Sequence, residues 1–420
     1  MLDGLRQGLV RTRQMATKMR PIRRTIALDE AKALVDAAVR PIDHTERLPL
    51  AEADGRVLAE PIVATADVPP FARAAMDGYA VRAADTAGAT RERPRLLTRV
   101  ATVFTGQVAD RGVGPGECIE IATGAPMPEG ADAVVIVEET DGEASGRVQA
   151  FSPVAPGQHI GPQGADIRRG QQVLDANAVL TPSRIGAIAA LGRADVLVYE
   201  RPSVAILSTG NEIVEPGASL GPGQIYDINR FTLAAVVARH GGVPVPHRTA
   251  SDTMADLSRA VDECLQSDVL VFSGGSSVGE RDLILDVLTA RGELIFHGIA
   301  VKPGKPTAFG RIGGKLFFGM PGYPTSCLSN AYVLLVPGLR RMARLPPHTT
   351  RSVMLPLSRR ITSAPGRHQI YTVTIADGSA VPAFKSSGDI TSMSQADGYI
   401  EIAADTDAVE AGTIVEVKLF

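Results

Sequence analysis

The feature that most constrains the fold is the alternation of continuous apolar runs with amphipathic segments across residues 201–345. Residues 204–208 and 268–272 are almost wholly apolar, which predicts strands buried on both faces. Residues 230–240 and 282–290 have helical patterns, and Gly241-Gly242 ends the first of these. We therefore expect an α/β domain whose parallel-rich sheet is covered by helices on both sides.

A further helix is expected after residue 252, with Ser251 or Asp252 as its N-cap. The remaining segments predict other architectures. Residues 25–66 and 168–200 contain helical patterns, residues 67–167 are rich in short strands and turns, and residues 346–420 return to short strands that suggest a small β-barrel. Residues 1–24 are strongly basic and lack an apolar run, so they are expected to form a solvated leader rather than a signal peptide.

Composition argues against several classes of protein. The formal net charge is −3, aromatic residues make up 4%, and Trp is absent, which disfavours a nucleic-acid partner. No window reaches the ~18 apolar residues of a membrane span. The cysteines, Cys118, Cys264 and Cys327, are odd in number and widely spaced, as expected for small buried side chains in a reducing cytoplasm.

The candidate chemistry lies where the strands of residues 201–345 end, because ligands of open parallel sheets bind there. Thr209 and Gly210 follow the first strand and can present backbone N–H groups to an anion, and Glu212 can hold a metal. A serine- and glycine-rich stretch follows the strand at 268–272 and precedes a helix, which predicts a phosphate-binding nest at residues Ser273, Gly274, Gly275, Ser276, Ser277 and Gly279. Asp282 opens that helix, and a bridging Mg²⁺ would reconcile its charge with a bound phosphate.

Two further loops belong to the same edge of the predicted sheet. Lys302 and Lys305 lie in a stiff Val-Lys-Pro-Gly-Lys-Pro segment that pre-orders two cations for an anion. The loop with Pro321, Gly322 and Pro324 leads into a helix that Thr325 or Ser326 is expected to cap. Outside this domain, the loops that contain Asp77 and Asp166 are Pro- and Gly-rich turns with an acid, which alone predict only turns.

Together these segments resemble the molybdopterin molybdenumtransferase family, known as MoeA in bacteria and as the E domain of gephyrin in animals. The resemblance spans about residues 25–420 and rests on AMDGYAV at 75–81, GNE at 210–212, GQIYDIN at 223–229, SGGSSVG at 273–279 and KPGKP at 302–306. The GQIYDIN segment adds Asp227 and Asn229 to the candidate substrate-binding residues.

The resemblance implies a dimer of four-domain chains: an elongated helical domain (25–66 and 168–200), an inserted β domain (67–167), a three-layer α/β/α molybdopterin-binding domain (201–345) and a C-terminal barrel (346–420). It implies that adenylylated molybdopterin and molybdate or tungstate react with Mg²⁺-dependent release of AMP, the last step of molybdenum cofactor biosynthesis. The family's catalytic positions correspond to Asp77, Asp166, Glu212, Asp252, Asp282 and Lys302, with Glu212, Asp252 and Asp282 as metal ligands. Further partners expected from the family are a molybdopterin adenylyltransferase and molybdoenzyme chaperones.

This chain departs from the family at Asn211, where Asp is frequent, and at Tyr323, where Asn is frequent. Residues 386–394 look like a subgroup variant of the barrel. These departures leave the choice between molybdate and tungstate open. Two rival functions also remain: a molybdopterin adenylyltransferase, which lacks the Met76–Tyr79 segment and the barrel, and a binding scaffold, which would not need all five acids.

Overall fold

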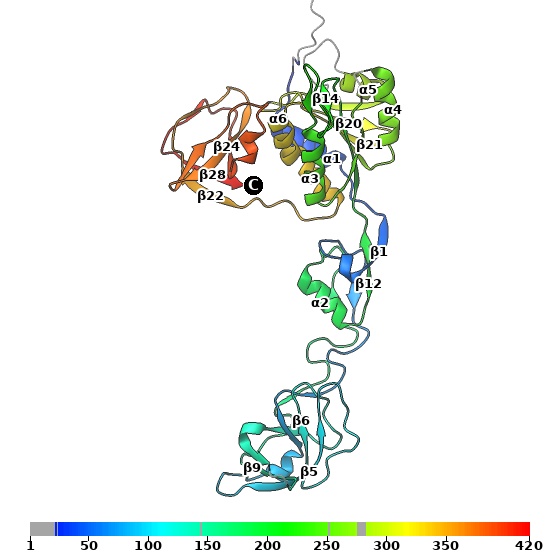
Figure 1. The fold of residues 1–420 in the computed structure, drawn as a ribbon, viewed down its shortest axis with the longest axis vertical. Helices are drawn as coiled ribbons and strands as arrows, with labels where there is room; N and C mark the ends of the chain where they lie inside the picture. Colours follow the sequence, from blue (N-terminus) through cyan, green and yellow to red (C-terminus); the bar gives the residue numbers. More distant parts are fainter. Residues whose placement is uncertain (1–21, 23, 143–144, 251–252, 275–282) are drawn as a thin grey trace, which may run out of the picture. The chain divides into compact units, whose positions relative to one another are not determined.

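The computed structural model describes residues 22, 24–142, 145–250, 253–274 and 283–420. They form two compact units, of which Thr45–Val198 is one and the flanking parts of the chain together are the other. Figure 1 labels the elements of both. Among the described residues, no helix is long and apolar enough to cross a membrane.

The larger unit is organised around a six-stranded sheet. Its strands, in spatial order, are β16 (Val243–Pro246), β13 (Ser203–Ser208), β17 (Val269–Ser273), β21 (Lys315–Met320), β20 (Ala308–Ile312) and β18 (Gly292–His297). The first four are mutually parallel, β20 pairs antiparallel with β21, and β18 pairs antiparallel with β20. The parallel strands place the loops after β13, β17 and β21 at one edge of the sheet, where the sequence predicts the site.

Alternate residues of each central strand enter different cores. Ile206 and Val271 belong to a core with α1 (Leu28–Ala38), α3 (Asn229–Arg239), η4 (Ala331–Leu335) and α7 (Val336–Met342). Leu207 and Phe272 belong to a second core with α4 (Met254–Cys264) and α5 (Leu283–Arg291). Figure 1 shows α4 and α5 on the opposite side of the sheet from α1 and α3. The period-two alternation of the strands explains why both faces of the sheet need helical cover.

Two predicted helix caps are wrong. The N-cap of α4 is Thr253, whose hydroxyl accepts a hydrogen bond from the Asp256 backbone N–H, so neither Ser251 nor Asp252 holds that position. The helix α6 (Pro324–Asn330) begins one residue before Thr325, because Pro324 occupies its first turn and needs no hydrogen bond for its nitrogen.

The C-terminal residues form a second six-stranded sheet with the order β19 (Val301–Lys302), β24 (His368–Ala376), β26 (Gly398–Ile402), β28 (Ile414–Leu419) and β22 (Ser352–Pro356), and β25 (Ser379–Pro382) pairs with β24. The short strands β23 (Ile361–Thr362) and β27 (Ala408–Val409) pair with each other, and α8 is Thr391–Ser394. The strand β19 comes from the lysine-containing loop, so this loop is part of both regions. A separate parallel pair is β14 (Ile213–Val214) with β15 (Ile225–Tyr226).

The smaller unit contains a third six-stranded sheet: β7 (Ala133–Ile136), β4 (Gly78–Val81), β6 (Glu117–Ile121), β5 (Arg95–Val103), β9 (Arg147–Ala150) and β8 (Thr140–Gly142). Short 3₁₀ helices η2 (Ala83–Thr86) and η3 (Val137–Glu139) connect its strands. The strand β3 (Arg73–Ala74) pairs with β10 (Ile160–Gly161). All pairings of the six-stranded sheet are antiparallel except that of β5 with β6.

The rest of the smaller unit joins two separated stretches of chain. The strand β1 (Thr45–Pro49) pairs with β12 (Asp195–Tyr199), and β2 (Ile62–Val63) pairs with β11 (Gln172–Leu174). A core containing Leu58, Ile62, Ile188 and Val196 packs these strands with η1 (Leu50–Glu52) and α2 (Pro182–Ala190). The structure differs from the expected grouping of residues 25–66, because α1 packs in the core of the larger unit through Leu28, Ala31 and Val35.

Candidate active site

A cavity of about 1260 Å³ opens at the carboxyl ends of β13, β17 and β21. We call it the strand-end cavity. The predicted residues that line it are Thr209, Glu212, Asp227, Asn229, Ser273, Gly274, Lys302, Lys305, Pro321, Gly322 and Pro324. Most of the described residues that the sequence assigned to this sheet edge therefore meet in one cavity.

Serine hydroxyl groups connect the ends of the first two strands. Ser208 Oγ donates to Asp227 Oδ1 over 2.9 Å and lies 3.2 Å from Ser273 Oγ. The Thr209 backbone N–H donates to the Ser273 carbonyl over 2.9 Å. These contacts hold the loops after β13 and β17 against each other at the floor of the cavity.

Two glycines are required where these loops approach. Gly274 has a φ of +95°, and a Cβ there would lie 2.3 Å from the Thr209 carbonyl oxygen. Gly210 has a φ of +140°, and a Cβ there would lie 2.7 Å from the carboxylate oxygens of Glu212. A side chain at Gly274 would meet backbone, whereas at Gly210 the positive φ disfavours a side chain and the Glu212 carboxylate would have to shift.

Asp227 and Asn229 bring buried oxygen atoms to the cavity. Asp227 is 3% exposed, and its Oδ1 accepts hydrogen bonds from Ser208 Oγ and from the Arg230 backbone N–H. Asn229 Nδ2 donates to the Gly322 carbonyl over 2.8 Å. Among the described residues, neither Asp227 Oδ2 nor Asn229 Oδ1 has a hydrogen-bond partner, although Arg230 Nε lies 3.6 Å from Asp227 Oδ2. Both oxygens are buried beside the cavity and lack a hydrogen-bond donor in the described structure.

The lysine loop, residues 302–306, is held in place by the buried side chain of a residue that the sequence analysis did not identify. Asn330 is fully buried and donates to the Gly304 carbonyl and to Thr307 Oγ1. Lys305 Nζ donates to the Ile22 carbonyl over 3.1 Å, which occupies part of its donor capacity. Lys302 lines the cavity, and no described residue forms a hydrogen bond or ion pair with its side chain.

The C-terminal region contributes a wall that sequence reasoning missed. Arg367, Phe384, Lys385, Ser386, Ser387 and Gly388 line the cavity. The Thr325 backbone N–H donates to the Ser387 carbonyl and its hydroxyl donates to the Asp389 carbonyl. Nothing in the local sequence of the Lys-Ser-Ser-Gly run indicates that it reaches the α/β sheet.

The other predicted site residues are not in this cavity or are not described. Asp77 and Asp166 belong to the smaller unit, where both are exposed. The Thr123 backbone N–H and hydroxyl donate to Asp77 Oδ1, and these two bonds lower the pKa of its carboxyl. The predicted positions Gly275, Ser276, Ser277, Gly279, Asp252 and Asp282 lie outside the described residues. Within the part of the chain that is described, no group of three or more His, Cys, Asp or Glu side chains could hold a metal.

Three family models match successive parts of the chain. They describe a MoeA N-terminal region (domain I and II) at residues 26–192, a probable molybdopterin binding domain at 205–341 and a MoeA C-terminal region (domain IV) at 354–420. A molybdopterin molybdenumtransferase 2 of Mycobacterium tuberculosis is 36% identical over 395 residues, which cover 90% of this chain and 95% of that protein. The chain belongs to the MoeA family.

Other members of the MoeA family support the same assignment. The molybdopterin molybdenumtransferase of Haemophilus influenzae is 32% identical, and the match covers 94% of this chain and 98% of that protein. A crystal structure of a molybdopterin biosynthesis MoeA protein from Pyrococcus horikoshii superposes with a TM-score of 0.82 at 37% identity, covering 94% of this chain and 99% of that one. The predicted multidomain α/β fold is thereby confirmed.

The cysteine prediction is also consistent with the structure. Cys118, Cys264 and Cys327 are free and buried. Burial raises the pKa of the Cys118 and Cys264 thiols to about 12 and that of Cys327 further still. These three side chains are small core hydrophobes rather than nucleophiles or metal ligands.

Proposed function

We propose that this chain is a molybdopterin molybdenumtransferase that inserts molybdenum, as molybdate, into adenylylated molybdopterin and releases AMP. One observation carries the assignment: the cations of the lysine loop and the buried acid of the GQIYDIN segment line a single cavity in a chain of the MoeA family. A substrate with phosphates and an oxyanion needs those cations, and the acids would hold a divalent metal that neutralises the phosphates.

The cationic side chains give the cavity its preference for anions. Lys302, Lys305, Arg367 and Lys385 line it, and Glu212 and Asp227 are its described acids. Lys302 is the best candidate to contact the reacting groups, since Lys305 already donates to Ile22. We assign the Thr209 and Gly274 backbones, together with the proposed nest at Gly275, Ser276, Ser277 and Gly279, to the phosphates.

The acids of this edge fit a hard divalent cation. Asp227 Oδ2 and Asn229 Oδ1 are oxygens without hydrogen-bond partners among the described residues, and oxygen is the donor type that Mg²⁺ prefers. Glu212 lines the cavity, and we propose that it holds the ion with Asp252 and Asp282. When bound, Mg²⁺ would supply charge neutralisation on the phosphates and a template for cleavage of the adenylate.

We propose that two chains complete each site. Asp77 and Asp166 belong to the smaller unit, and the cavity belongs to the larger one. In a twofold dimer the same contact occurs twice, so each cavity can receive the acids of the partner chain. This proposal includes four domains, with α1 assigned to the α/β domain instead of the helical domain and with the C-terminal strands as a barrel. It also includes a cytoplasmic protein that receives substrate from an adenylyltransferase and passes product to molybdoenzyme chaperones.

The test is a single-turnover assay with adenylylated molybdopterin, Mg²⁺ and either molybdate or tungstate, in which AMP release is followed. We expect the oxyanion to accelerate AMP release and the faster oxyanion to identify the metal preference. ATP and molybdopterin form the second arm. Pyrophosphate formation from these two without any oxyanion would instead support an adenylyltransferase, and no turnover in either arm would leave a binding scaffold.

A further inference from the structure

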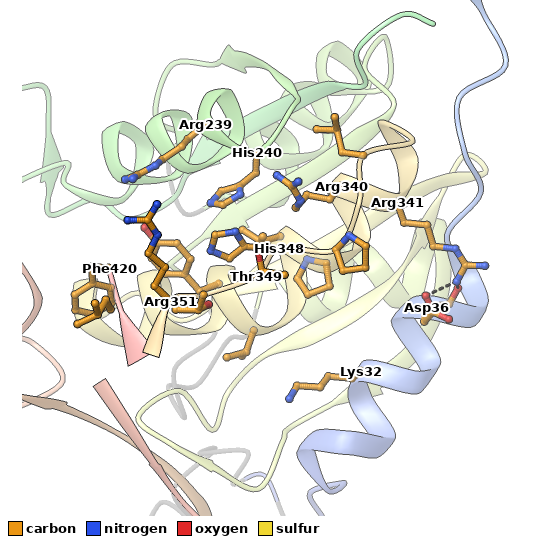
Figure 2. A pocket seen from close by; sticks show the side chains of 18 of the residues that line it. Lys32, Asp36, Arg239, His240, Arg340, Arg341, His348, Thr349, Arg351 and Phe420 are labelled. Carbon is orange, nitrogen blue, oxygen red and sulfur yellow. Dashed lines mark hydrogen bonds and ion pairs between the residues drawn. The ribbon is translucent and has the colours of Figure 1, made fainter. Parts of the chain in front are cut away.

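A second cavity of the larger unit shares no lining residue with the strand-end cavity. Its volume is about 970 Å³, and it lies between the C-terminal end of α3, the η4–α7 segment, the linker that follows α7, and the ends of β26 and β28. Five side chains are central to it: Arg239, His240, Arg340, His348 and Arg351. We call it the arginine–histidine pocket, and Figure 2 shows these residues around one space.

The positive charge of this pocket is not neutralised by the acids beside it. Its two lining acids already have partners, since Asp36 pairs with Arg341 and Glu401 pairs with Lys418 and His368. A further lining cation, Arg344, pairs with Asp43. Arg239, Arg340 and Arg351, by contrast, have no acid within ion-pair distance among the described residues. Three guanidinium groups therefore line the cavity without an ion-pair partner among the described side chains.

The side chain of Arg340 is held in place by a hydrogen bond to the backbone. Its Nε donates to the Pro346 carbonyl over 2.7 Å, which leaves its terminal nitrogens free to contact a ligand. Burial also lowers the pKa of its guanidinium. A partly buried guanidinium that is already held in one orientation binds an anion favourably. Little side-chain entropy remains to be lost when the ligand binds.

Two imidazoles occupy the centre of the pocket. His240 is 3% exposed, and its Nδ1 is buried without a hydrogen-bond partner in the described structure. Its ring lies edge-on to that of His348, with centroids 4.7 Å apart. In the view of Figure 2 both rings lie between Arg340 on one side and Arg239 and Arg351 on the other. The unpaired nitrogen is a polar contact that a ligand can complete.

The charges around His240 explain its protonation state. Burial first, and then the positive charges of His348, Arg340 and Arg239, lower the pKa of His240 to about 4. The pKa of His348 is lowered by burial and by the same two arginines. Both rings are therefore neutral near pH 7, and a bound anion would raise their pKa values by opposing the arginine charges.

We propose that the arginine–histidine pocket binds a small molecule carrying at least two phosphate groups, separately from the strand-end cavity. Guanidinium groups bind phosphate oxygens in a bidentate manner, and arginines on two sides of the histidines match a ligand with more than one phosphate. The volume is in the range of about 300–1000 Å³ typical of small-molecule sites. An adjoining apolar wall of Tyr332, Tyr399 and Phe420 can accept an organic group attached to the phosphates.

The charged and titratable groups that surround the two histidines come from every element around the pocket. They are Lys32 and Asp36 from α1, Arg239 from α3, Tyr332 from η4, Arg340, Arg341 and Arg344 from α7 and the turn after it, Arg351 from the linker, and Tyr399 and Glu401 from β26. A bound anion would raise the pKa of both histidines, so binding of the ligand should be accompanied by proton uptake.

The experiment follows the histidine side-chain NMR signals of the full-length protein during titration with inorganic pyrophosphate, and separately with ADP, at pH 6.5. A Lys302→Gln background weakens competing binding at the strand-end cavity. We expect saturable shifts of the His240 and His348 signals, and tighter binding of ADP than of pyrophosphate if the apolar wall is used. No shift of either signal at millimolar pyrophosphate or ADP would overturn the proposal.

Two variants and one control test the arginines. Arg239→Gln and Arg351→Gln should each weaken binding about tenfold or more, because each removes a charge-assisted contact. Arg360→Gln is the matched control, since Arg360 pairs with Glu410 on the surface. If a variant does not fold, the titration of the parent protein still decides. Stronger shifts with a hexaglutamate peptide than with either phosphate compound would show that the pocket serves an acidic protein segment, which also contradicts the proposal.

Discussion

Asn330 Nδ2 donates a hydrogen bond to the carbonyl oxygen of Gly304 over 2.9 Å, from a side chain that is fully buried behind the lysine loop. The same nitrogen donates to Thr307 Oγ1. The position of the Lys302–Lys305 loop is therefore determined by a residue of α6, twenty-six positions later in the chain.

This relationship predicts that Asn330→Ala destabilises the fold and lowers activity together. Loss of two buried hydrogen bonds should reduce the free energy of unfolding by about 1–3 kcal/mol. The rate of AMP release should fall as well, because the lysines lose their fixed position. Urea unfolding and the AMP assay measure the two effects. An active variant with normal stability would show that the lysine loop keeps its conformation without the Asn330 hydrogen bonds.

Lys302→Gln should separate activity from stability. The side chain lines the strand-end cavity and is part of no described side-chain contact, so its removal should leave the melting temperature unchanged. The rate of AMP release should fall by about 10²-fold or more if the charge stabilises the transferring groups. A Lys302→Arg variant that restores part of the rate would confirm that charge is what is required.

Gly304→Ala should be more harmful than an alanine at another left-handed glycine. Gly304 has a φ of +111°, and a Cβ there would lie 2.3 Å from Asn330 Nδ2. Gly157 has a φ of +82° with nothing within 4 Å of its added Cβ, which makes Gly157→Ala the matched control. Both variants carry backbone strain of about 1 kcal/mol or more, so a large excess loss of stability in Gly304→Ala reports the clash together with any additional strain at its larger φ. Equal melting temperatures would mean that Asn330 moves aside at no cost.

Mixing inactive chains tests the proposed shared site. Asp77→Ala and Glu212→Ala lie in different units of the chain, so a mixed dimer would contain one site with both changes and one with neither. Random reassortment makes half of the dimers mixed, and activity should recover to about a quarter of the unmodified enzyme. Native mass spectrometry verifies the exchange. Mixed dimers without recovered activity would place each site within one chain.

Glu401 gives a pH-dependent contribution to stability. His368 beside it and the ammonium of Lys418 lower the pKa of its carboxyl to about 2. A carboxyl whose pKa is depressed by folding stabilises the protein above its unfolded value of about 4.5, and this contribution is lost as pH falls toward 2. Glu401→Gln should therefore cost about 1–3 kcal/mol at pH 7 and progressively less between about pH 4.5 and pH 2. A cost that is constant over this range would exclude the ionised carboxylate as its source.

The sequence predicts the central sheet because its strands are apolar on both faces. A strand of this kind is stable only where both of its faces are buried. It also predicts Thr209, Gly274 and Lys302 at one edge, since the ends of parallel strands meet there. The period of the apolar pattern can be read from any stretch of about ten residues, without knowledge of contacts between distant segments.

What the sequence did not predict depends on contacts between distant segments. Arg367 and Lys385 reach the strand-end cavity through the pairing of β24 with β19 and the contacts of Thr325 with the segment after Lys385, and no local pattern encodes these contacts. Likewise α1 is amphipathic, and its periodicity shows an apolar face without showing which core receives it. The choice of Thr253 over its two neighbours as the α4 cap is a difference of one residue, within the usual uncertainty of helix ends.

The two-residue strand β19 has a consequence for anyone who dissects this chain. Val301 and Lys302 pair with His368 and Gln369 of the C-terminal sheet, and the His368 backbone N–H donates to the Ala300 carbonyl. Lys302 is thus anchored on one side by residues that a protein truncated near residue 345 would lack. Such a shortened chain would keep its α/β sheet but would lose the strand pairing that fixes the position of Lys302. Transferring this site to another scaffold therefore requires both the α/β region and the C-terminal region.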